Sequence, residues 1–176
     1  MSESSKKHKA TATKELTFGI FVCSTSRYQQ LKNGVRINDA SGDLIETLVK
    51  NAGHKVLFKT IISDNKIQIQ NSVKRVLSST ELDAAIFCGG TGIAHSDVTI
   101  ENVMPFLDKT LPGFGEIFRH LSYNKLGSAA ILSRAAAGVA KGKAVFCIPG
   151  SPDAMQFSIE RLILPEAPHI VRHARE

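Results

Sequence analysis

LDAAIFCGGTGIAHSDVTIENV, at residues 82–103, is the stretch from which the fold can be inferred. Its first seven residues are mostly apolar, as in a strand that is buried on both faces of a parallel sheet. Three glycines around Thr91 follow directly, and nine residues later an amphipathic helical pattern is under way. A buried strand, a glycine-rich turn and a helix in this order indicate an α/β protein.

The same alternation extends along the rest of the chain. Short apolar runs alternate with segments whose apolar residues recur at helical spacing, which is typical of βαβ units and a mainly parallel sheet. The predicted strands are 16–24, 54–62, 82–88, 126–132 and 143–148. The predicted helices are 41–54, 66–79, 100–107, 113–122, 151–164 and 166–176.

Several residues indicate where these helices begin and end. Asp39 or Ser41 suits the N-cap of the first predicted helix, and Gly53 suits its end. Pro105 is expected to kink or end the helix at 100–107, because proline lacks the backbone N–H. Pro152 falls in the first turn of its helix, where that N–H is not needed.

Composition places the chain among ordinary globular proteins. Its 176 residues predict one domain, residues 16–176, preceded by a disordered basic arm at 1–15. No apolar run is long enough to span a membrane, and the arm does not resemble a signal peptide, so we expect a cytoplasmic protein. The net charge of +6 comes from scattered residues without interleaved aromatic side chains, which disfavours a dedicated nucleic-acid binder.

The cysteines and histidines do not form a recognisable ligand motif. Cys23, Cys88 and Cys147 are far apart and odd in number, which argues against a disulfide framework and against zinc spacing. Each follows an apolar run, so we expect small buried side chains, with a catalytic thiol as the alternative. The six histidines look dispersed, and none is assigned to a metal.

Three polar, glycine- or serine-containing segments follow predicted strands. They are CSTSR at 23–27, CGGTG at 88–92 and CIPGS at 147–151. Ligands of open parallel sheets bind at the carboxyl ends of the strands, so these segments are expected to converge on one site.

The GGTG segment has the composition of an anion-binding turn. Gly89, Gly90 and Gly92 permit positive φ angles and let backbone N–H groups face an anion, and Thr91 adds a hydroxyl. A tight structural turn is the alternative. The segment is not a Walker loop, because no Gly-Lys-Ser/Thr follows, and it lacks the glycine spacing of the dinucleotide fingerprint.

Carboxylates lie close to this turn in the sequence. Asp97, Thr99 and Glu101 enter the next helix at alternate positions. One interpretation is helix capping by Asp97 or Ser96, and the other is a carboxylate that holds magnesium beside a phosphate. Asp39 is a second carboxylate with the same two interpretations.

Two further segments carry polar groups that suit an anionic ligand. Ser133 and Arg134 offer a hydroxyl and a fixed cation, or else a helix start with a surface arginine. Gly150 and Ser151 offer backbone N–H groups, or else only a tight turn. No GxSxG or HExxH motif occurs. The chemistry favoured is therefore phosphoryl or nucleotidyl transfer, which depends on positioning and charge neutralisation.

Seven motifs in order carry a family resemblance. The chain resembles the molybdenum cofactor biosynthesis protein B and MogA family, which shares its fold with the gephyrin G domain. The resemblance implies a three-layer α/β/α sandwich around a mostly parallel sheet, assembled as trimers or, in the B branch, as hexamers. The motifs are TSRY (25–28), DASG (39–42), GGTG (89–92), DVTIE (97–101), PGFGEIFR (112–119), SRAAAG (133–138) and PGSP (149–152).

The resemblance also implies an activity and roles for these motifs. Active members use Mg-ATP to adenylylate the terminal phosphate of molybdopterin and release pyrophosphate. Asp97 would be the carboxylate most needed, through Mg²⁺, and Asp39 would share the metal, with Glu101 in support. The substrate-binding residues implied are Gly89, Gly90, Thr91 and Gly92 at the phosphate, Thr99 beside them, and Ser133, Gly150 and Ser151 on the pterin side. Other proteins of the same pathway are possible partners.

Two positions depart from the family pattern. Cys88 stands where many members have threonine, and Ser96 stands where many have arginine. Without that guanidinium, a non-catalytic oligomer that binds molybdopterin or a nucleotide in the same pathway is the alternative function. A nucleotide- or sugar-phosphate-binding domain of another family is a further alternative.

Overall fold

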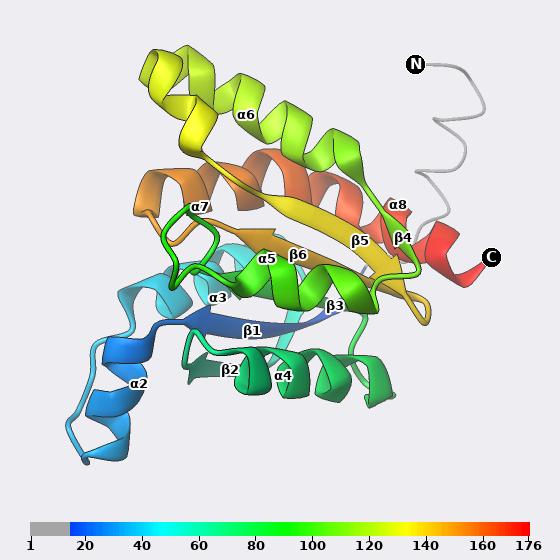
Figure 1. The fold of residues 1–176 in the computed structure, drawn as a ribbon. Coiled ribbons are helices and arrows are strands. Elements are labelled where there is room, and N and C mark those ends of the chain that lie inside the picture. Colours follow the sequence, from blue (N-terminus) through cyan, green and yellow to red (C-terminus); the bar gives the residue numbers. More distant parts are fainter. Residues whose placement is uncertain (1–14) are drawn as a thin grey trace.

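The computed structural model describes residues 15–176, in which helices cover both faces of a six-stranded sheet (Figure 1). The predicted arm at 1–15 falls almost wholly outside the described residues. The strand order is β2-β1-β3-β6-β5-β4. The strands are β1 (Thr17–Cys23), β2 (Lys55–Ile62), β3 (Ala84–Cys88), β4 (Lys109–Thr110), β5 (Ala136–Ala140) and β6 (Lys143–Ile148).

The first four strands in this order are parallel. Ile86 at the centre of β3 pairs with Ile20 of β1 and with Phe146 of β6. All five residues of β3 are buried, which explains why the strand is apolar on both faces. β5 runs antiparallel to β6, and β4 runs antiparallel to β5. The predicted mostly parallel sheet is therefore confirmed, with an antiparallel extension on one side.

One face of the sheet packs against α3 (Ala40–Asn51) and the C-terminal helix. That helix consists of α7 (Pro152–Ser158), a π-helical turn (Ile159–Ile163) and α8 (Leu164–Arg175). Alternate strand residues point into this layer. Its fully buried side chains include Phe18, Ile20, Ile86, Phe146, Ile45 and Ile159.

The opposite face packs against α4 (Lys66–Ser78) and α5 (Thr99–Val103), which Figure 1 shows on the other side of the sheet. The remaining strand residues point this way, and Phe21 stacks on Phe87 with ring centroids 4.6 Å apart. The two apolar layers establish the three-layer α/β/α arrangement.

Local signals for helix ends are largely confirmed. Asp39 is the N-cap of α3 and accepts a hydrogen bond from the Gly42 N–H at 3.1 Å. Gly53, just beyond the helix, has a φ of +83°, which glycine adopts without a steric penalty. Asn65 caps α4 in the same way. The α-helix at 99–103 ends before Pro105, which lies in a 3-10 turn (Met104–Phe106).

The predicted strand at 126–132 is wrong. Leu126 ends α6 (Pro112–Leu126), and Gly127–Leu132 form a 3-10 helix. Ile131 and Leu132 are 82% and 54% exposed, so this apolar run does not enter the core. The strand lies instead at 136–140, where small residues form a hairpin with β6 through Lys141 and Gly142, both with positive φ.

Two other elements differ from the prediction. The polar segment after β1, expected as a loop, contains the helix α2 (Thr25–Lys32), none of whose residues is buried. The two C-terminal helices expected at 151–164 and 166–176 are one continuous helix with an internal π turn. Pro165 follows this turn closely, so the irregular hydrogen bonding of the π turn accommodates its missing N–H group, whereas Pro168 lies inside α8.

His54 makes the stability of the fold depend on pH. The residue is 8% exposed, and its Nδ1 accepts a hydrogen bond from the Leu16 N–H at 3.3 Å. Burial lowers the pKa of His54 below its ordinary value. The unfolded chain therefore takes up the proton at a higher pH than the folded chain, and stability falls as the pH drops through about 6.5.

We expect the unfolding midpoint in urea to be lower at pH 5.5 than at pH 7.5. In His54→Asn, whose side-chain oxygen can replace the Nδ1 acceptor, this pH-dependent loss should be smaller. An equal loss in both proteins would contradict the role given to His54.

Candidate active site

The carboxyl ends of the parallel strands meet at one edge of the sheet. Ser24, after β1, donates its N–H to the Ile62 carbonyl of β2 at 2.9 Å, and Gly89 donates to the Ile148 carbonyl of β6 at 3.0 Å. A methyl group on Gly150 would lie 3.4 Å from the Gly89 Cα atom. The segments after β1, β3 and β6 therefore converge as predicted.

Gly89 and Gly90 form a turn that other residues could not occupy. Their φ angles are +103° and +62°. A methyl group on Gly89 would lie 2.5 Å from the Cys23 carbonyl oxygen, and one on Gly90 would lie 2.4 Å from Thr99 Oγ1. The turn thus brings bare backbone to the end of the central strand, which is the arrangement that anion-binding turns use.

Two buried polar atoms lie beneath this turn. Asp64 Oδ1 has no hydrogen-bond partner among the described residues, and Thr99 Oγ1 lies beside the Cys23 thiol. A methyl group on Gly90 would lie 2.6 Å from the same Asp64 oxygen. Thr99 itself is fully buried and donates its backbone N–H to the Gly90 carbonyl at 2.9 Å. An unpaired buried oxygen such as Asp64 Oδ1 is rare unless a ligand, ion or water completes it.

Asp64 was not among the sequence-predicted site residues. It follows β2, and its Oδ2 accepts a hydrogen bond from the Thr25 N–H at 2.9 Å. The segment SDN at 63–65 is fully explained in the sequence by a turn and a helix cap. The sequence feature that could have identified Asp64 as a site residue is its position directly after a predicted strand, at the same edge of the sheet.

Asp97 does not cap the following helix, so that interpretation is wrong. α5 begins at Thr99 with Val98 at the N-cap position, and no described side chain caps it. Asp97 Oδ2 instead accepts a hydrogen bond from the Ala94 N–H at 3.0 Å, within its own loop. A methyl group on Gly92 would lie 2.6 Å from Asp97 Oδ2. The partly exposed carboxylate is therefore held beside the glycine turn.

Arg134 joins the turn to Glu101. Its Nε donates to the Thr91 carbonyl at 2.9 Å, and its Nη1 donates to Glu101 Oε1 at 2.6 Å. The hydrogen bond from Arg134 holds the pKa of Glu101 below its ordinary value, so this carboxylate is ionised at neutral pH. Arg134 thus places a permanent positive charge at the turn.

Asp39 forms a second charged pair at this edge. Arg27 of α2 donates to Asp39 Oδ1 at 3.3 Å, and 13% of the Asp39 side chain is exposed. An open pocket on this side is lined by Arg36, Ile37, Asn38, Asp39, Asp43 and Lys59. Arg27 lies in the TSRY motif and was not predicted as a site residue by itself.

The other predicted residues lie at the rim of the site. Ser133 is partly exposed and directly precedes Arg134, so it lies close to the turn in the chain. Gly150 and Ser151 are exposed between β6 and α7, and Ser151 is the N-cap of α7. Because this segment lies beside Gly89, the backbone N–H groups of Gly150 and Ser151 are open to a ligand.

A comparison with known families identifies this arrangement. The model of a family described as a probable molybdopterin binding domain matches residues 19–169. The chain belongs to this molybdopterin-binding domain family.

Relatives within the molybdopterin-binding domain family are similar over most of the chain. Molybdenum cofactor biosynthesis protein B of Bacillus subtilis (strain 168) is 48% identical over 139 residues, which cover 78% of this chain and 82% of that protein. A probable molybdopterin adenylyltransferase of Methanocaldococcus jannaschii is 40% identical over 163 residues, or 93% of this chain and 96% of that protein.

Solved structures agree with this assignment. A crystal structure of a molybdenum cofactor biosynthesis protein B matches with a TM-score of 0.83 and 40% identity, and it covers 94% of this chain and 99% of that one. The α/β fold expected from the family resemblance is therefore confirmed.

The cysteines of this family member are not suited to catalysis. Cys23, Cys88 and Cys147 are all buried and free. Burial raises the pKa of Cys88 to about 12 and raises the pKa values of the other two as well. Thiols of this kind carry almost no thiolate at neutral pH, which supports the interpretation as small buried side chains.

The charged groups of the site do not form a complete metal cage. Within residues 15–176 no group of three or more His, Cys, Asp or Glu side chains could hold a metal ion. Mg²⁺ is commonly held by one or two carboxylates together with substrate phosphates, so this finding agrees with a metal that arrives with a nucleotide. None of the helices in the same residues is long and apolar enough to cross a membrane.

Proposed function

We propose that the protein acts in molybdenum cofactor biosynthesis by transferring the adenylyl group of ATP to the terminal phosphate of molybdopterin. The observation that carries the proposal is the glycine turn at residues 89–92, which presents bare backbone between Asp97 and the Arg134–Glu101 pair. The proposal treats residues 16–176 as one domain that works in the cytoplasm, where ATP is available. The name of the Methanocaldococcus relative supports the reaction type.

The reaction needs no nucleophile from the protein. An oxygen of the molybdopterin phosphate attacks the α-phosphorus of ATP, a new P–O–P bond forms, and pyrophosphate leaves. Both reactants are anions, so the main task of the protein is to hold them together against their repulsion. The turn N–H groups and Arg134 supply positive charge for this purpose, and Gly150 and Ser151 line the pterin side.

The residues of the site fit a magnesium ion. The candidate donors are all oxygens, which Mg²⁺ prefers, and Asp64 Oδ1 is a buried oxygen without a hydrogen-bond partner among the described residues. Asp97 and Asp39 would hold Mg²⁺, with Glu101 kept ionised nearby. When bound, the ion supplies charge neutralisation at the phosphate oxygens.

Arg134→Lys should weaken the reaction without unfolding the protein. Lysine keeps the charge but cannot contact the Thr91 carbonyl and Glu101 Oε1 together. We expect kcat/KM for adenylyl transfer to fall about tenfold, as for the loss of one charged hydrogen bond. Arg161→Lys, at an exposed position on the C-terminal helix, is the matched control. Equal activity in both variants would contradict the role in adenylyl transfer that is proposed for Arg134.

The proposal includes a homo-oligomer, trimeric or hexameric. Several large apolar side chains are exposed on α6 and the 3-10 helix that follows it, and Tyr123 and Ile131 line the same pocket. Exposed apolar surface of this kind is typical of an interface. The exposed side chains are Ile117, Tyr123, Leu126, Ile131 and Leu132.

The decisive experiment is an anaerobic incubation of the full chain with molybdopterin and Mg-ATP. We expect adenylylated pterin and pyrophosphate in amounts above one equivalent of protein. Tight pterin binding without product would support the alternative of a non-catalytic binding oligomer. In that case Ser96→Arg, which restores the family arginine, would be tested for recovered turnover. Absence of pterin binding would overturn both functions.

A further inference from the structure

The PGFGEIFR motif at 112–119 has no part in the reaction proposed above. It forms the first half of α6, and its Glu116 and Arg119 line a pocket together with residues 135–137 at the start of β5. This α6–β5 pocket has a volume of about 260 Å³. Ligand sites commonly measure about 300–1,000 Å³, so the pocket suits a small flat ring system rather than a whole nucleotide.

Gly115 lets α6 lie directly against the backbone at the start of β5. A methyl group on Gly115 would lie 2.7 Å from the Ala135 carbonyl oxygen and 3.2 Å from Arg119 Nη1. The guanidinium of Arg119 is therefore held beside the strand backbone, in the space that a larger residue would fill. Residues 135–137 are all alanine, so this side of the pocket carries only methyl side chains. A flat ring can lie against such a wall.

The α6–β5 pocket adjoins the candidate active site. Ala135 directly follows Arg134, whose Nε donates to the Thr91 carbonyl of the glycine turn at 2.9 Å. Ser133, which was predicted to lie on the pterin side, directly precedes the same arginine. A ligand whose phosphate lies at the glycine turn can therefore extend past Arg134 into the pocket.

Glu116 and Arg119 carry opposite charges that the protein itself does not use. Both side chains are exposed, and within residues 15–176 neither makes a hydrogen bond or an ion pair. Residues three apart on a helix face the same way, so the two charged groups border the pocket side by side. The pocket thus offers two acceptor oxygens from a carboxylate and the N–H donors of a guanidinium.

This pair of groups is complementary to the pyrimidine edge of a pterin. That edge presents the 2-amino group and N3–H as neighbouring donors, and the C4 carbonyl beside them as an acceptor. A carboxylate can accept two parallel N–H bonds, as it does from arginine. A guanidinium can donate to the carbonyl and can also stack on the face of a flat ring.

We infer that Glu116 and Arg119 bind the pyrimidine edge of the pterin and select a 2-amino-4-oxo ring. Glu116 accepts hydrogen bonds from the 2-amino group and N3–H, and Arg119 donates to the C4 carbonyl. The identity of the ligand rests on the proposed function. The two residues act at the ring end of the ligand, away from the phosphate at which the new bond forms.

The test is a fluorescence titration of the full chain with pterin and with lumazine at pH 7, without ATP. Lumazine has a carbonyl oxygen in place of the 2-amino group, and this oxygen would face the Glu116 carboxylate. We expect the parent protein to bind pterin at least tenfold more tightly than lumazine, because a charged acceptor is left without its donor. Glu116→Gln should abolish or reverse this preference, because the amide offers both a donor and an acceptor.

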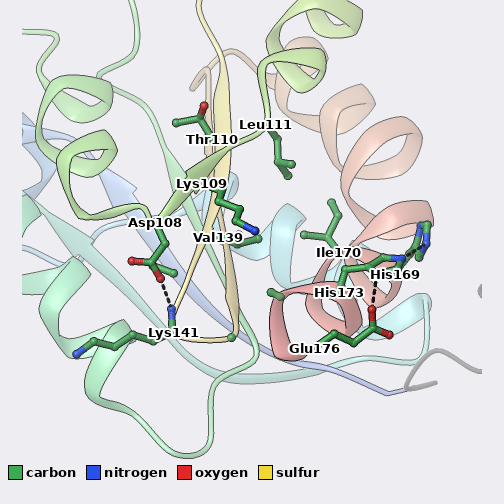
Figure 2. A pocket seen from close by; sticks show the side chains of 13 residues that line it. Asp108, Lys109, Thr110, Leu111, Val139, Lys141, His169, Ile170, His173 and Glu176 are labelled. Carbon is green, nitrogen blue, oxygen red and sulfur yellow. Dashed lines mark hydrogen bonds and ion pairs between the residues drawn. The ribbon is translucent and has the colours of Figure 1, made fainter.

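Two further variants locate the ring in the α6–β5 pocket. Arg119→Gln should weaken the binding of pterin and lumazine alike, since both rings have the C4 carbonyl. Lys109→Gln is the matched control, because it removes a cation from the neighbouring pocket between α8 and the β4–β5 strands. Figure 2 shows that the Lys109 side chain extends toward α8. Pterin binding should be unchanged in this variant, and a loss equal to that of Arg119→Gln would contradict the assignment.

Equal affinities of the parent protein for the two rings, no pterin binding at millimolar concentration, or an unchanged preference in Glu116→Gln would each overturn the inference. In adenylyl transfer, Glu116→Gln should raise KM for molybdopterin and leave kcat nearly unchanged, because Glu116 does not contact the reacting phosphate. Turnover without ring preference would contradict only the role of Glu116 and Arg119. Ring preference without turnover would contradict only the proposed reaction.

Discussion

Asp97→Asn is expected to lower the rate of adenylyl transfer about 100-fold and to leave the fold intact. The change removes the charge of the carboxylate that lies beside the glycine turn, and a preorganised charged group at a phosphate site is commonly worth a factor of this order. Asparagine keeps an oxygen that can accept the hydrogen bond from the Ala94 N–H. The loop should therefore keep its conformation while the negative charge is lost.

Initial rates of pyrophosphate release at saturating Mg-ATP would measure this effect. Glu81→Gln is the matched control, because Glu81 is an exposed carboxylate that precedes β3 at the opposite edge of the sheet. The circular dichroism spectrum should be unchanged in both variants. Turnover of Asp97→Asn at the parental rate would exclude Asp97 from catalysis.

Gly89→Ala is expected to destabilise the protein by about 2–3 kcal/mol, the cost of a strained backbone position at a functional site. The φ of +103° is unfavourable for alanine, and the added methyl group would lie 2.5 Å from the Cys23 carbonyl oxygen. This oxygen belongs to the backbone of β1, so it cannot move away as a side chain could. The strand ends at the site should shift, and adenylyl transfer should fall as well.

Equilibrium unfolding in urea would measure the loss of stability. Gly113→Ala is the matched control, since Gly113 lies in the first turn of α6 with nothing within 4 Å of an added methyl group. That substitution should be neutral or slightly stabilising, because it restricts the unfolded chain. A Gly89→Ala protein as stable as the control would show that the turn is more adaptable than its geometry implies.

The parts of the fold that could be predicted are those in which burial and sequence pattern agree. β3 is buried along its whole length, so its apolar run, which glycines follow directly, matches the pattern of a central strand. The run at 126–132 has a similar composition, but Ile131 and Leu132 face outward, and no local pattern distinguishes an exposed apolar surface from a core. The adjacent strand β5 was missed because its small residues carry little strand propensity.

The candidate site was predictable where the residue types are unusual for their position. Glycines directly after a buried strand indicate the turn, whatever its ligand. Asp64 and the Arg134–Glu101 pair depend on contacts between segments more than 30 residues apart in the chain. Sequence spacing alone cannot place such groups together, and Asp64 is already accounted for locally by a turn.

The two outer strands of the sheet determine how copies of the protein can associate. An unpaired strand edge is a template on which another chain can add, and this leads to open-ended aggregation. Here β4 is only two residues long, and the other border strand, β2, carries Lys55, whose side chain is largely exposed. The short strand β4 and the charged strand β2 both disfavour edge-to-edge pairing with strands of another copy. In the homo-oligomer proposed above, contacts would therefore be made by side chains on helical surfaces, and such contacts can close into a finite particle.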